Sequence, residues 1–364
     1  MRDISPFGLF HKLDHKKEYY PLDGQLELTY RCNLNCIHCF CKGSEDRDKE
    51  LTTQEWKKII DEIQKEGCIW LTFTGGEPLV RDDFLEIYTY AKEKGFIISI
   101  YTNATLFTER IVNYLKKLPP YSIEITLNSI TPDTYEAITQ IKGSFERVMD
   151  NIKRLKENKI PLMLTLKTNC LKQNKHELGK IKKWTEELLG GEPSDNRYHF
   201  RYDPLIYPRL NGDKTPCNDR LSFEELLEVR RQDVDIWDEY QKALYSDFTD
   251  LERDRSFLYH CNAWKKRFFV SPYGKLKFCI FSDKFSVSLK TTSLKEGFYK
   301  VFPQLLKEQF KTDSKCKDCS LRPICCYCPA RAYLETGDEE APVPYYCELA
   351  EETARETQAK LSNC

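Results

Sequence analysis

Two hydrophobic periodicities alternate along residues 25–206. Short runs rich in β-branched and aromatic residues predict strands at 25–30, 69–74, 96–101, 122–127, 160–168 and 198–206. Between these runs, apolar residues recur every three or four positions and predict helices at about 53–66, 83–94, 108–117, 132–139, 144–158 and 175–189. Six strand–helix units in a row predict an α/β fold, with a parallel sheet, right-handed crossovers and helices on the outside of the sheet.

The clearest local signal for a helix is at residue 52. Thr52 lies three residues before Glu55, which is the spacing of a capping box. The apolar residues from Trp56 to Ile63 then fall on one helical face, and Gly67 marks the end of the helix. This segment therefore predicts the first helix of the repeating series.

The alternation stops after residue 206. A loop rich in Pro, Asn, Gly and Asp occupies 208–219, and a highly charged stretch at about 223–245 predicts a helix. Further on, Ser271-Pro272-Tyr273-Gly274 is a favourable turn sequence and predicts a β-hairpin around it. The second part of the chain is therefore expected to be a smaller unit of a different kind.

Charge and composition exclude several classes of protein. The 364 residues include 56 Lys and Arg against 57 Asp and Glu, so the net charge of −1 favours neither nucleic acid nor a membrane surface as a partner. No apolar run reaches the roughly 18 residues of a membrane span, and the first residues lack the apolar core of a signal peptide. We therefore expect a cytoplasmic protein, in which 16 cysteines indicate metal or redox chemistry rather than disulfides.

Three of these cysteines directly follow the first predicted strand. Cys32, Cys36 and Cys39 have the spacing C-x3-C-x2-C. Three thiolates on an iron–sulfur cubane leave one iron open for a small molecule. The alternatives are a partial zinc site or buried thiols, although structural zinc usually has four ligands in C-x2-C pairs. In parallel barrels, functional groups lie on the loops after the strands, where this triad falls.

The following two loops carry the segments Gly75-Gly76-Glu77 and Thr102-Asn103. Together with the triad and His38, the segment Thr74–Pro78 resembles the radical S-adenosylmethionine (SAM) enzymes. The resemblance implies a partial, TIM-like (β/α)6 barrel and a [4Fe-4S] cluster on the three cysteines. It also implies reductive cleavage of SAM to methionine and a 5′-deoxyadenosyl radical, which takes a hydrogen atom from the substrate.

The same resemblance suggests which residues contact SAM. The loop Gly75–Pro78 would meet the methionyl ammonium, strand 122–127 would approach the ribose and methionyl parts, and a lysine would pair with the carboxylate. The candidates are His38, Gly75, Gly76, Glu77, Pro78, Thr102, Asn103, Ser122, Asn128, Lys142 and Lys167. Each polar candidate has an ordinary alternative, since lysines are mostly solvated and hydroxyls at strand ends mostly cap turns.

A second set of cysteines follows residue 260. It consists of Cys261, Cys279, Cys316, Cys319, Cys325, Cys328 and Cys347. This set resembles the SPASM extension of peptide-modifying radical SAM enzymes, which implies two auxiliary [4Fe-4S] clusters. By the interleaved ligation of that family, Cys261, Cys279 and Cys328 would hold the nearer cluster, and the other four would hold the outer one.

This second set departs from the family pattern in one place. Two residues rather than three separate Cys325 from Cys328, and Cys326 lies between them, so the sequence leaves open which of these is a ligand. Cys217, in the preceding loop, is a further candidate for the open iron of the nearer cluster. Zinc is the alternative for the two C-x2-C pairs, but a five-residue gap is short for zinc ribbons and would leave the remaining cysteines unexplained.

The predicted organisation follows from both resemblances. It comprises an N-terminal leader segment (1–24), the radical SAM partial barrel (25–206), a bridging loop and helix (207–256), a small cysteine-rich SPASM domain (257–350) and a C-terminal tail (351–364). The implied function is maturation of a ribosomally made precursor peptide by oxidation or crosslinking. We expect a separate leader-binding protein, because the segment before the first strand is too short for a fused leader-binding domain, and a reductant such as flavodoxin or ferredoxin.

Two other functions remain open. One is the anaerobic sulfatase-maturing type, which oxidises Cys or Ser to formylglycine and places an acidic residue almost directly after the second hairpin cysteine as general base. Here the nearest is Asp283, four positions after Cys279. The other is a non-catalytic partner protein that only binds clusters and a peptide, but such a protein would not need the open iron and the SAM loop.

Overall fold

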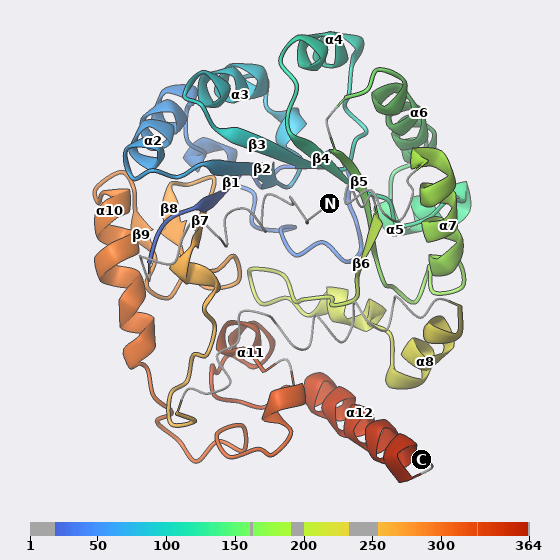
Figure 1. The fold of residues 1–364 in the computed structure, drawn as a ribbon, viewed down its shortest axis with the longest axis vertical. Coiled ribbons are helices and arrows are strands. Elements are labelled where there is room, and N and C mark those ends of the chain that lie inside the picture. The colour runs from blue at the N-terminus through green and yellow to red at the C-terminus, as the bar shows by residue number, and fades with distance from the viewer. Residues whose placement is uncertain (1–18, 161–162, 191–199, 233–253, 326, 363–364) are drawn as a thin grey trace, which may run out of the picture.

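The computed structural model describes residues 19–160, 163–190, 200–232, 254–325 and 327–362. In these ranges one sheet runs through the molecule in the order β6-β5-β4-β3-β2-β1-β7-β8-β9 (Figure 1). The strands are β1 (Asp23–Thr29), β2 (Trp70–Gly75), β3 (Ile97–Thr102), β4 (Ser122–Thr126), β5 (Met163–Asn169), β6 (Phe200–Asp203), β7 (Arg267–Val270), β8 (Lys275–Lys277) and β9 (Val287–Ser288). Strands β1 to β6 pair in parallel, which confirms the predicted α/β partial barrel.

Helices cover the outside of the parallel strands (Figure 1). They are α2 (Thr53–Lys65), α3 (Phe84–Glu93), α4 (Glu109–Lys117), α5 (Pro132–Thr139), α6 (Ser144–Glu157) and α7 (Leu178–Leu189). The predicted capping box is present, because the Thr52 hydroxyl accepts from the backbone N–H of Glu55 and the Glu55 carboxylate accepts from the backbone N–H of Thr52. The alternation of strand and helix periodicities in the sequence was therefore sufficient to locate these elements to within a few residues.

The predicted C-terminal hairpin continues the barrel sheet. Strands β7 and β8 form an antiparallel hairpin, and β7 also pairs in parallel with β1, with Gly24 opposite Phe268. A Cβ atom at Gly24 would lie 2.5 Å from the Phe268 ring, so a glycine lets the aromatic ring cross the strand here. The hairpin that precedes Cys279 is therefore fixed against the strand that precedes the cysteine triad.

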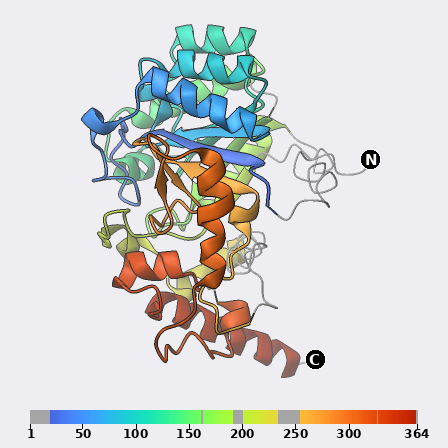
Figure 2. The same cartoon turned by 90° about the vertical axis from the view of Figure 1, so that its left-hand side faces the viewer.

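The helices α8 (Phe223–Gln232), α11 (Pro329–Thr336) and α12 (Pro344–Ser362) lie on the side of the molecule where the chain ends (Figure 2). Helix α10 (Leu294–Glu296) instead begins beside β9 at the edge of the sheet (Figure 1), and it continues as π- and 3-10-helical turns to Lys307. The predicted helix at 223–245 is present as α8, and its part beyond residue 232 lies outside the described residues. Helix α12 runs across residue 350 without interruption, so the tail of the chain begins as part of this helix.

One hydrophobic core joins the two parts of the chain. The buried aromatic residues Phe268, Phe298 and Phe302 belong to the same cluster as the residues under the barrel helices. A buried ion pair adds a polar link, since both guanidinium nitrogens of Arg220 contact the carboxylate of Glu335 on α11, at 2.6 and 2.9 Å. Within the described ranges, no helix is both long enough and apolar enough to cross a lipid bilayer.

Candidate functional site

The loops after β1, β2 and β3 meet at the carboxyl edge of the sheet. Thr29, at the end of β1, pairs with Gly75, at the end of β2. The backbone N–H groups of Gly76 and Glu77 then donate to the carbonyls of Thr29 and Arg31, at 2.7 and 2.9 Å. The Gly-Gly-Glu segment is therefore anchored directly on the start of the cysteine loop.

The three thiols of the triad lie close enough to influence one another. Burial, the Glu77 carboxylate and the nearby Cys39 sulfur together raise the pKa of Cys32 to about 12. Burial also raises the pKa of Cys36, and the Cys39 and Cys32 sulfurs act in the same direction. Cys39 differs, because a hydrogen bond with the Cys41 thiol and backbone N–H groups lower its pKa to about 7 despite burial. Binding of a cluster would release the protons of these thiols, which would then ligate iron as thiolates.

The surroundings of the triad suit an iron–sulfur cluster. The Cys32 sulfur accepts from the backbone N–H of Leu34 at 3.4 Å and from the side-chain amide of Asn103 at 3.5 Å, and N–H donors of this kind stabilise a ligating thiolate. In the described part of the chain, no three His, Cys, Asp or Glu side chains are arranged to hold one metal ion. A cluster places each cysteine on a different iron, and three cysteines with N–H donors fit that group.

Glu77 connects the loop after β2 to the loop after β3. Its side chain is fully buried and accepts from Leu79 N at 3.0 Å, Asn103 N at 2.7 Å and the Thr102 hydroxyl at 2.9 Å. Burial raises the pKa of Glu77 to about 7, and the three donors oppose that rise. Because protein donors occupy both carboxylate oxygens, the acceptors that this loop can offer to an ammonium are its backbone carbonyls.

The two glycines before Glu77 are needed for packing of the backbone. Gly75 has φ 133°, and a Cβ there would lie 2.0 Å from the carbonyl oxygen of Thr29. A Cβ at Gly76 would lie 2.4 Å from the carbonyl oxygen of Arg31. Close approach of the neighbouring strand and its loop therefore explains these glycines. Pro78 is buried at the start of a short 3-10 turn, Pro78–Val80, which extends this anchored segment.

His38, Asn128 and Lys167 form a second group inside the barrel. The Asn128 amide lies 3.4 Å from Nε2 of His38, and its oxygen accepts from the backbone N–H of Asn169 at 2.8 Å. Burial and then the Lys167 charge lower the pKa of His38 to about 4. The Nδ1 atom of His38 is buried without a hydrogen-bond partner in the protein, and Lys167 lies 3.3 Å from Asp203. Of the polar atoms in this group, Nδ1 of His38 is therefore the one that has no hydrogen-bond partner in the described part of the chain.

Two predicted residues lie elsewhere. Ser122 begins β4, pairs with Ser99 of β3 and with Met163 at the start of β5, and donates to the Ser99 hydroxyl at 2.7 Å. It therefore lies at the amino edge of the sheet, opposite the cysteine loop, and the structure does not bring it to the site. The prediction located the strand, but the functional edge of a parallel strand is its carboxyl end. Lys142 is exposed in the turn before α6 and lies outside the hydrogen-bonded groups described above.

The C-terminal cysteines separate into two groups. The pKa of Cys261 is raised to about 11 and that of Cys279 to about 12, mainly by burial and in both cases also by the nearby Cys328 sulfur. The second group contains Cys316. Burial raises the pKa of Cys316, and the nearby sulfurs of Cys347 and Cys319 act in the same direction. For these six cysteines the neighbours are those that interleaved ligation implies.

The remaining cysteines are placed less directly. The Cys325 sulfur lies 3.8 Å from the carbonyl oxygen of Tyr346, and so it approaches the chain next to Cys347. Burial raises the pKa of Cys217 to about 11, and its charged neighbours are Arg220, Glu335, Lys214 and Asp213. The structure therefore places Cys217 beside the buried ion pair. Cys326 lies outside the described residues.

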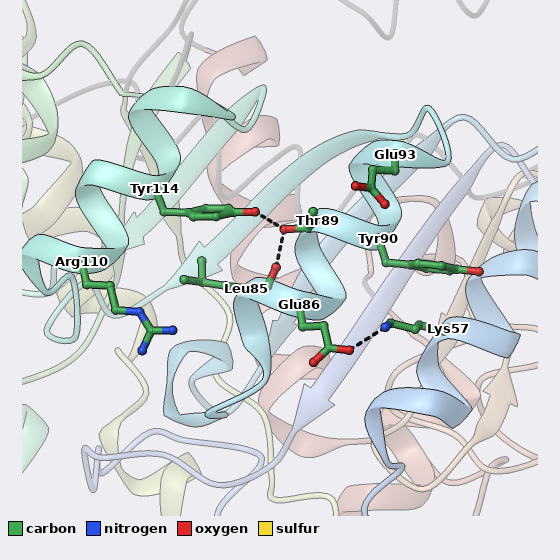
Figure 3. A pocket seen from close by; sticks show the side chains of 8 residues that line it. All are labelled: Lys57, Leu85, Glu86, Thr89, Tyr90, Glu93, Arg110 and Tyr114. Atoms are coloured by element: carbon green, nitrogen blue, oxygen red, sulfur yellow. Dashed lines mark hydrogen bonds and ion pairs between the residues drawn. The ribbon is translucent and has the colours of Figure 1, made fainter.

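A cavity of about 740 Å³ is lined by residues that follow the triad and by residues near the C-terminal cysteines. Its walls come from the loop after the triad, the loop at Leu210, the hairpin before Cys279, the segment after Cys279 and α11. The lining residues are Tyr30, Gly43, Ser44, Leu210, Asn211, Ser271, Tyr273, Lys275, Lys277, Phe281–Lys284, Tyr333, Leu334 and Glu339. The Tyr273 hydroxyl bonds to the carbonyl oxygen of Ser44 and joins two of these walls. A smaller cavity of about 380 Å³ lies on the outer side of the barrel between α2, α3 and α4 (Figure 3), and none of its lining residues is a predicted ligand.

Comparison with known proteins identifies the domain that carries these loops. Residues 26–185 match the family model described as the radical SAM superfamily. Residues 26–185 form a radical SAM domain. This domain contains the cysteine triad, the Gly-Gly-Glu loop and the loop after β3, so the resemblance seen in the sequence is confirmed. The family implies a [4Fe-4S] cluster and SAM as cofactors, and it identifies the chain as an enzyme.

Similarity to individual proteins extends beyond the radical SAM domain. The enzyme is 27% identical over 341 residues to the AdoMet-dependent heme synthase of Methanosarcina barkeri, which covers 88% of this chain and 94% of that protein. It is 26% identical over 275 residues to the antilisterial bacteriocin subtilosin biosynthesis protein AlbA of Bacillus subtilis, covering 73% of this chain and 57% of AlbA. Streptococcus suis SuiB bound to its precursor peptide SuiA superposes with TM-score 0.68 at 18% identity, covering 94% of this chain and 80% of SuiB.

Sequence reasoning missed the residues that connect these loops. Asn33, Thr105 and Asn151 hold the loop after β3 in place, and Asn33 directly adjoins the predicted ligand Cys32. Asn151 lies on α6 and donates to the carbonyl of Ala104 at 2.8 Å, where Ala104 has a positive φ of 59°. A buried asparagine on an otherwise apolar helix face was the signal available in the sequence.

Proposed function

We propose that this radical SAM enzyme modifies a ribosomally made peptide, which binds in the cavity between the cysteine triad and the C-terminal cysteines. The cavity carries this proposal, because its walls come from the loop after the triad, from the hairpin before Cys279 and from α11. A peptide held there lies between the site of radical formation and the candidate auxiliary clusters. Net oxidation or crosslinking needs such an arrangement, since the substrate radical must lose an electron.

The chemistry of the cavity walls suits a peptide. Aromatic side chains at Tyr273, Phe281 and Tyr333 provide apolar contact, and Tyr333 is 57% exposed. Peptide ligands combine apolar side chains with backbone polar groups, and this lining offers both kinds of contact.

The lysines of the cavity wall are neutralised by neighbouring carboxylates. Lys275 and Lys277 both contact Asp283, at 2.6 and 3.1 Å, and Lys284 contacts Glu308 at 2.7 Å. A substrate with several carboxylates would be held best by cations that lack such internal partners. The paired lysines therefore favour a peptide over a polycarboxylate.

A reaction on an iron porphyrin is the second candidate. It is supported by the similarity to the AdoMet-dependent heme synthase, which spans 94% of that protein, whereas AlbA is matched over 57% of its length. The pairing of the cavity lysines weighs against this candidate, since porphyrin carboxylates would have to displace Asp283 or Glu308.

Formylglycine formation is less well supported. That reaction needs a general base close to the second hairpin cysteine, and Asp283 is the nearest candidate by sequence. Burial acts to raise the pKa of Asp283, but the Lys277 and Lys275 ammonium groups outweigh it and hold the pKa below its usual value. A carboxylate stabilised in this way is a weak proton acceptor.

The cofactors of this proposal are one [4Fe-4S] cluster on Cys32, Cys36 and Cys39, SAM, and two auxiliary [4Fe-4S] clusters on the two C-terminal groups. When bound, the first cluster and SAM supply a carbon-centred radical that removes a hydrogen atom from the substrate. The protein would orient these groups: Glu77 fixes the loop after β2 against the loop after β3, where the carbonyls of Gly75 and Gly76 would accept from the SAM ammonium. Lys167 would pair with the SAM carboxylate if it exchanged its contact with Asp203, and the cavity walls would position the peptide and exclude water.

The proposal extends to partners. A cytoplasmic reductant such as flavodoxin or ferredoxin supplies electrons to the cluster, and a separate protein presents the leader of the precursor peptide. Genes for a short precursor peptide and a small leader-binding protein next to this gene would provide both reagents for the test.

The deciding experiment incubates the reconstituted enzyme with SAM, dithionite and that precursor peptide, and measures the peptide mass together with 5′-deoxyadenosine. A mass change that requires SAM supports peptide modification. Phe281→Ala and Tyr333→Ser should raise the KM for the peptide, whereas Tyr114→Phe in the outer cavity should leave it unchanged. An unmodified peptide, together with a shifted Soret band on addition of iron coproporphyrin, would replace this proposal with the porphyrin reaction.

A further inference from the structure

The side chain of Asn103 is held in a closed ring of hydrogen bonds. Its Nδ2 donates to Oδ1 of Asn33 at 3.0 Å, and Nδ2 of Asn33 donates to the Thr105 hydroxyl at 2.7 Å. That hydroxyl donates to Oδ1 of Asn103 at 2.6 Å and completes the ring. Each side chain in the ring therefore serves as both donor and acceptor, and the ring joins the cysteine loop to the loop after β3.

The orientation of the Asn103 amide is fixed independently of the ring. The backbone N–H of Thr105, which can only donate, lies 2.9 Å from Oδ1 of Asn103. This atom must then be the oxygen, so the NH2 group points the other way. One of its two protons goes to Asn33, and the second faces the sulfur of Cys32 at 3.5 Å.

The backbone under Asn103 is also held firmly. The N–H of Asn103 donates to the buried Glu77 carboxylate at 2.7 Å. The next residue, Ala104, has φ 59°, and α6 secures its carbonyl through Asn151 at 2.8 Å. A side chain with three ordered partners on a fixed backbone can hold an N–H group at one place on the cluster ligand.

We propose that Asn103 is a positioning residue whose amide N–H raises the reduction potential of the cluster held by Cys32. A donor to a thiolate stabilises the form with the greater negative charge, which is the form after the cluster accepts one electron. The donor therefore makes electron transfer from the external reductant to the cluster more favourable. This assigns Asn103 to the cluster ligand, in place of the direct SAM contact expected from the sequence.

The test compares four forms of the reconstituted enzyme without any peptide, so it does not depend on the proposed substrate. They are wild type, Asn103→Ala, Asn103→Asp and Thr105→Val. Asn103→Asp keeps the shape and the acceptor oxygen but replaces the donor with an oxygen. Thr105→Val breaks the ring while the backbone N–H at 105 still orients the amide.

The measurement is the midpoint potential of the triad cluster in an anaerobic dithionite titration followed by EPR. Signals of other clusters are subtracted with the variant Cys32→Ala/Cys36→Ala/Cys39→Ala. We expect the equilibrium for one-electron reduction to fall about tenfold in Asn103→Ala, which is about 59 mV for a one-electron couple, and further in Asn103→Asp. Thr105→Val should shift by less than half of that amount.

Three results would overturn the proposal. The first is an unchanged midpoint in both Asn103 variants. The second is a shift in Thr105→Val as large as that in Asn103→Ala, which would indicate general loosening of the loop. The third is loss of the triad's iron in both Asn103 variants, which would assign the residue to cluster assembly.

Discussion

Replacement of Glu77 tests whether this residue holds the SAM loop together. Glu77→Ala removes the acceptor for Leu79 N, Asn103 N and the Thr102 hydroxyl, all at 2.7–3.0 Å from a fully buried carboxylate. A buried donor without a partner costs about 1–3 kcal/mol. Because water entering the gap relieves part of the cost, we expect the free energy of unfolding to fall by about 3–5 kcal/mol.

Glu77→Gln should cost less. Its amide oxygen can still accept from Asn103, but its NH2 group would then face another donor, so we expect a loss of about 1–2 kcal/mol. Glu86→Gln is the matched control. Glu86 lies on the outer face of α3 with a side chain 55% exposed, and Lys57 contacts its carboxylate at 2.6 Å. Loss of such an exposed ion pair should change stability by less than about 1 kcal/mol.

The assay is urea unfolding of the anaerobic apoprotein, followed by far-UV circular dichroism, with the slope of the transition compared among variants. Equal midpoints for wild type and Glu77→Ala would refute the reasoning, since they would mean that the three donors find other partners. A loss in Glu86→Gln as large as that in Glu77→Gln would also refute it.

Three further substitutions test other parts of the fold. Burial raises the pKa of Glu27 from 4.5 to about 7. Protonated Glu27 therefore stabilises the folded state fully below pH 4.5, and this contribution is lost as the pH rises through 7. Glu27→Gln should remove about 3 kcal/mol of this pH dependence, measured by urea titrations at several pH values. Gly75→Ala would place a Cβ 2.0 Å from a backbone oxygen and should lower the free energy of unfolding by at least about 3 kcal/mol. Gly143→Ala is the control, because Gly143 has a positive φ but open space around it, and it should cost about 1 kcal/mol. Thermal unfolding would measure both losses. Arg220→Met should cost about 3–5 kcal/mol by leaving Glu335 buried without its partner, and adding Glu335→Leu should restore most of that loss in the same assay.

The sequence was sufficient for the elements of the barrel because their signals are local. The capping box at Thr52 and the alternation of periods involve residues within a few positions of one another, and the structure confirms both. The cysteine loop and the Gly-Gly-Glu loop could also be placed at one edge of the sheet. This follows from the rule that parallel strands present their carboxyl ends together.

Contacts between distant segments were not accessible in this way. The pairing of β1 with β7 joins residues more than two hundred positions apart, and no periodicity indicates which sheet edge the hairpin will join. Ser122 shows a related limit of sequence reasoning. The strand that carries Ser122 was predicted, but the residue lies at the amino end of that strand, away from the cysteine loop. Glu77 was predicted from the sequence to contact SAM, and only the structure shows that protein donors already occupy its carboxylate.

The most direct test of the central claim is the iron content of the anaerobically reconstituted enzyme, measured with 5′-deoxyadenosine formation from SAM and dithionite. Wild type is compared with the variant Cys32→Ala/Cys36→Ala/Cys39→Ala. With one SAM cluster and two auxiliary clusters, about twelve irons per chain should fall to about eight in the variant, and 5′-deoxyadenosine formation should be lost. Undiminished iron in the variant, or wild-type protein with full iron that forms no 5′-deoxyadenosine, would contradict the account.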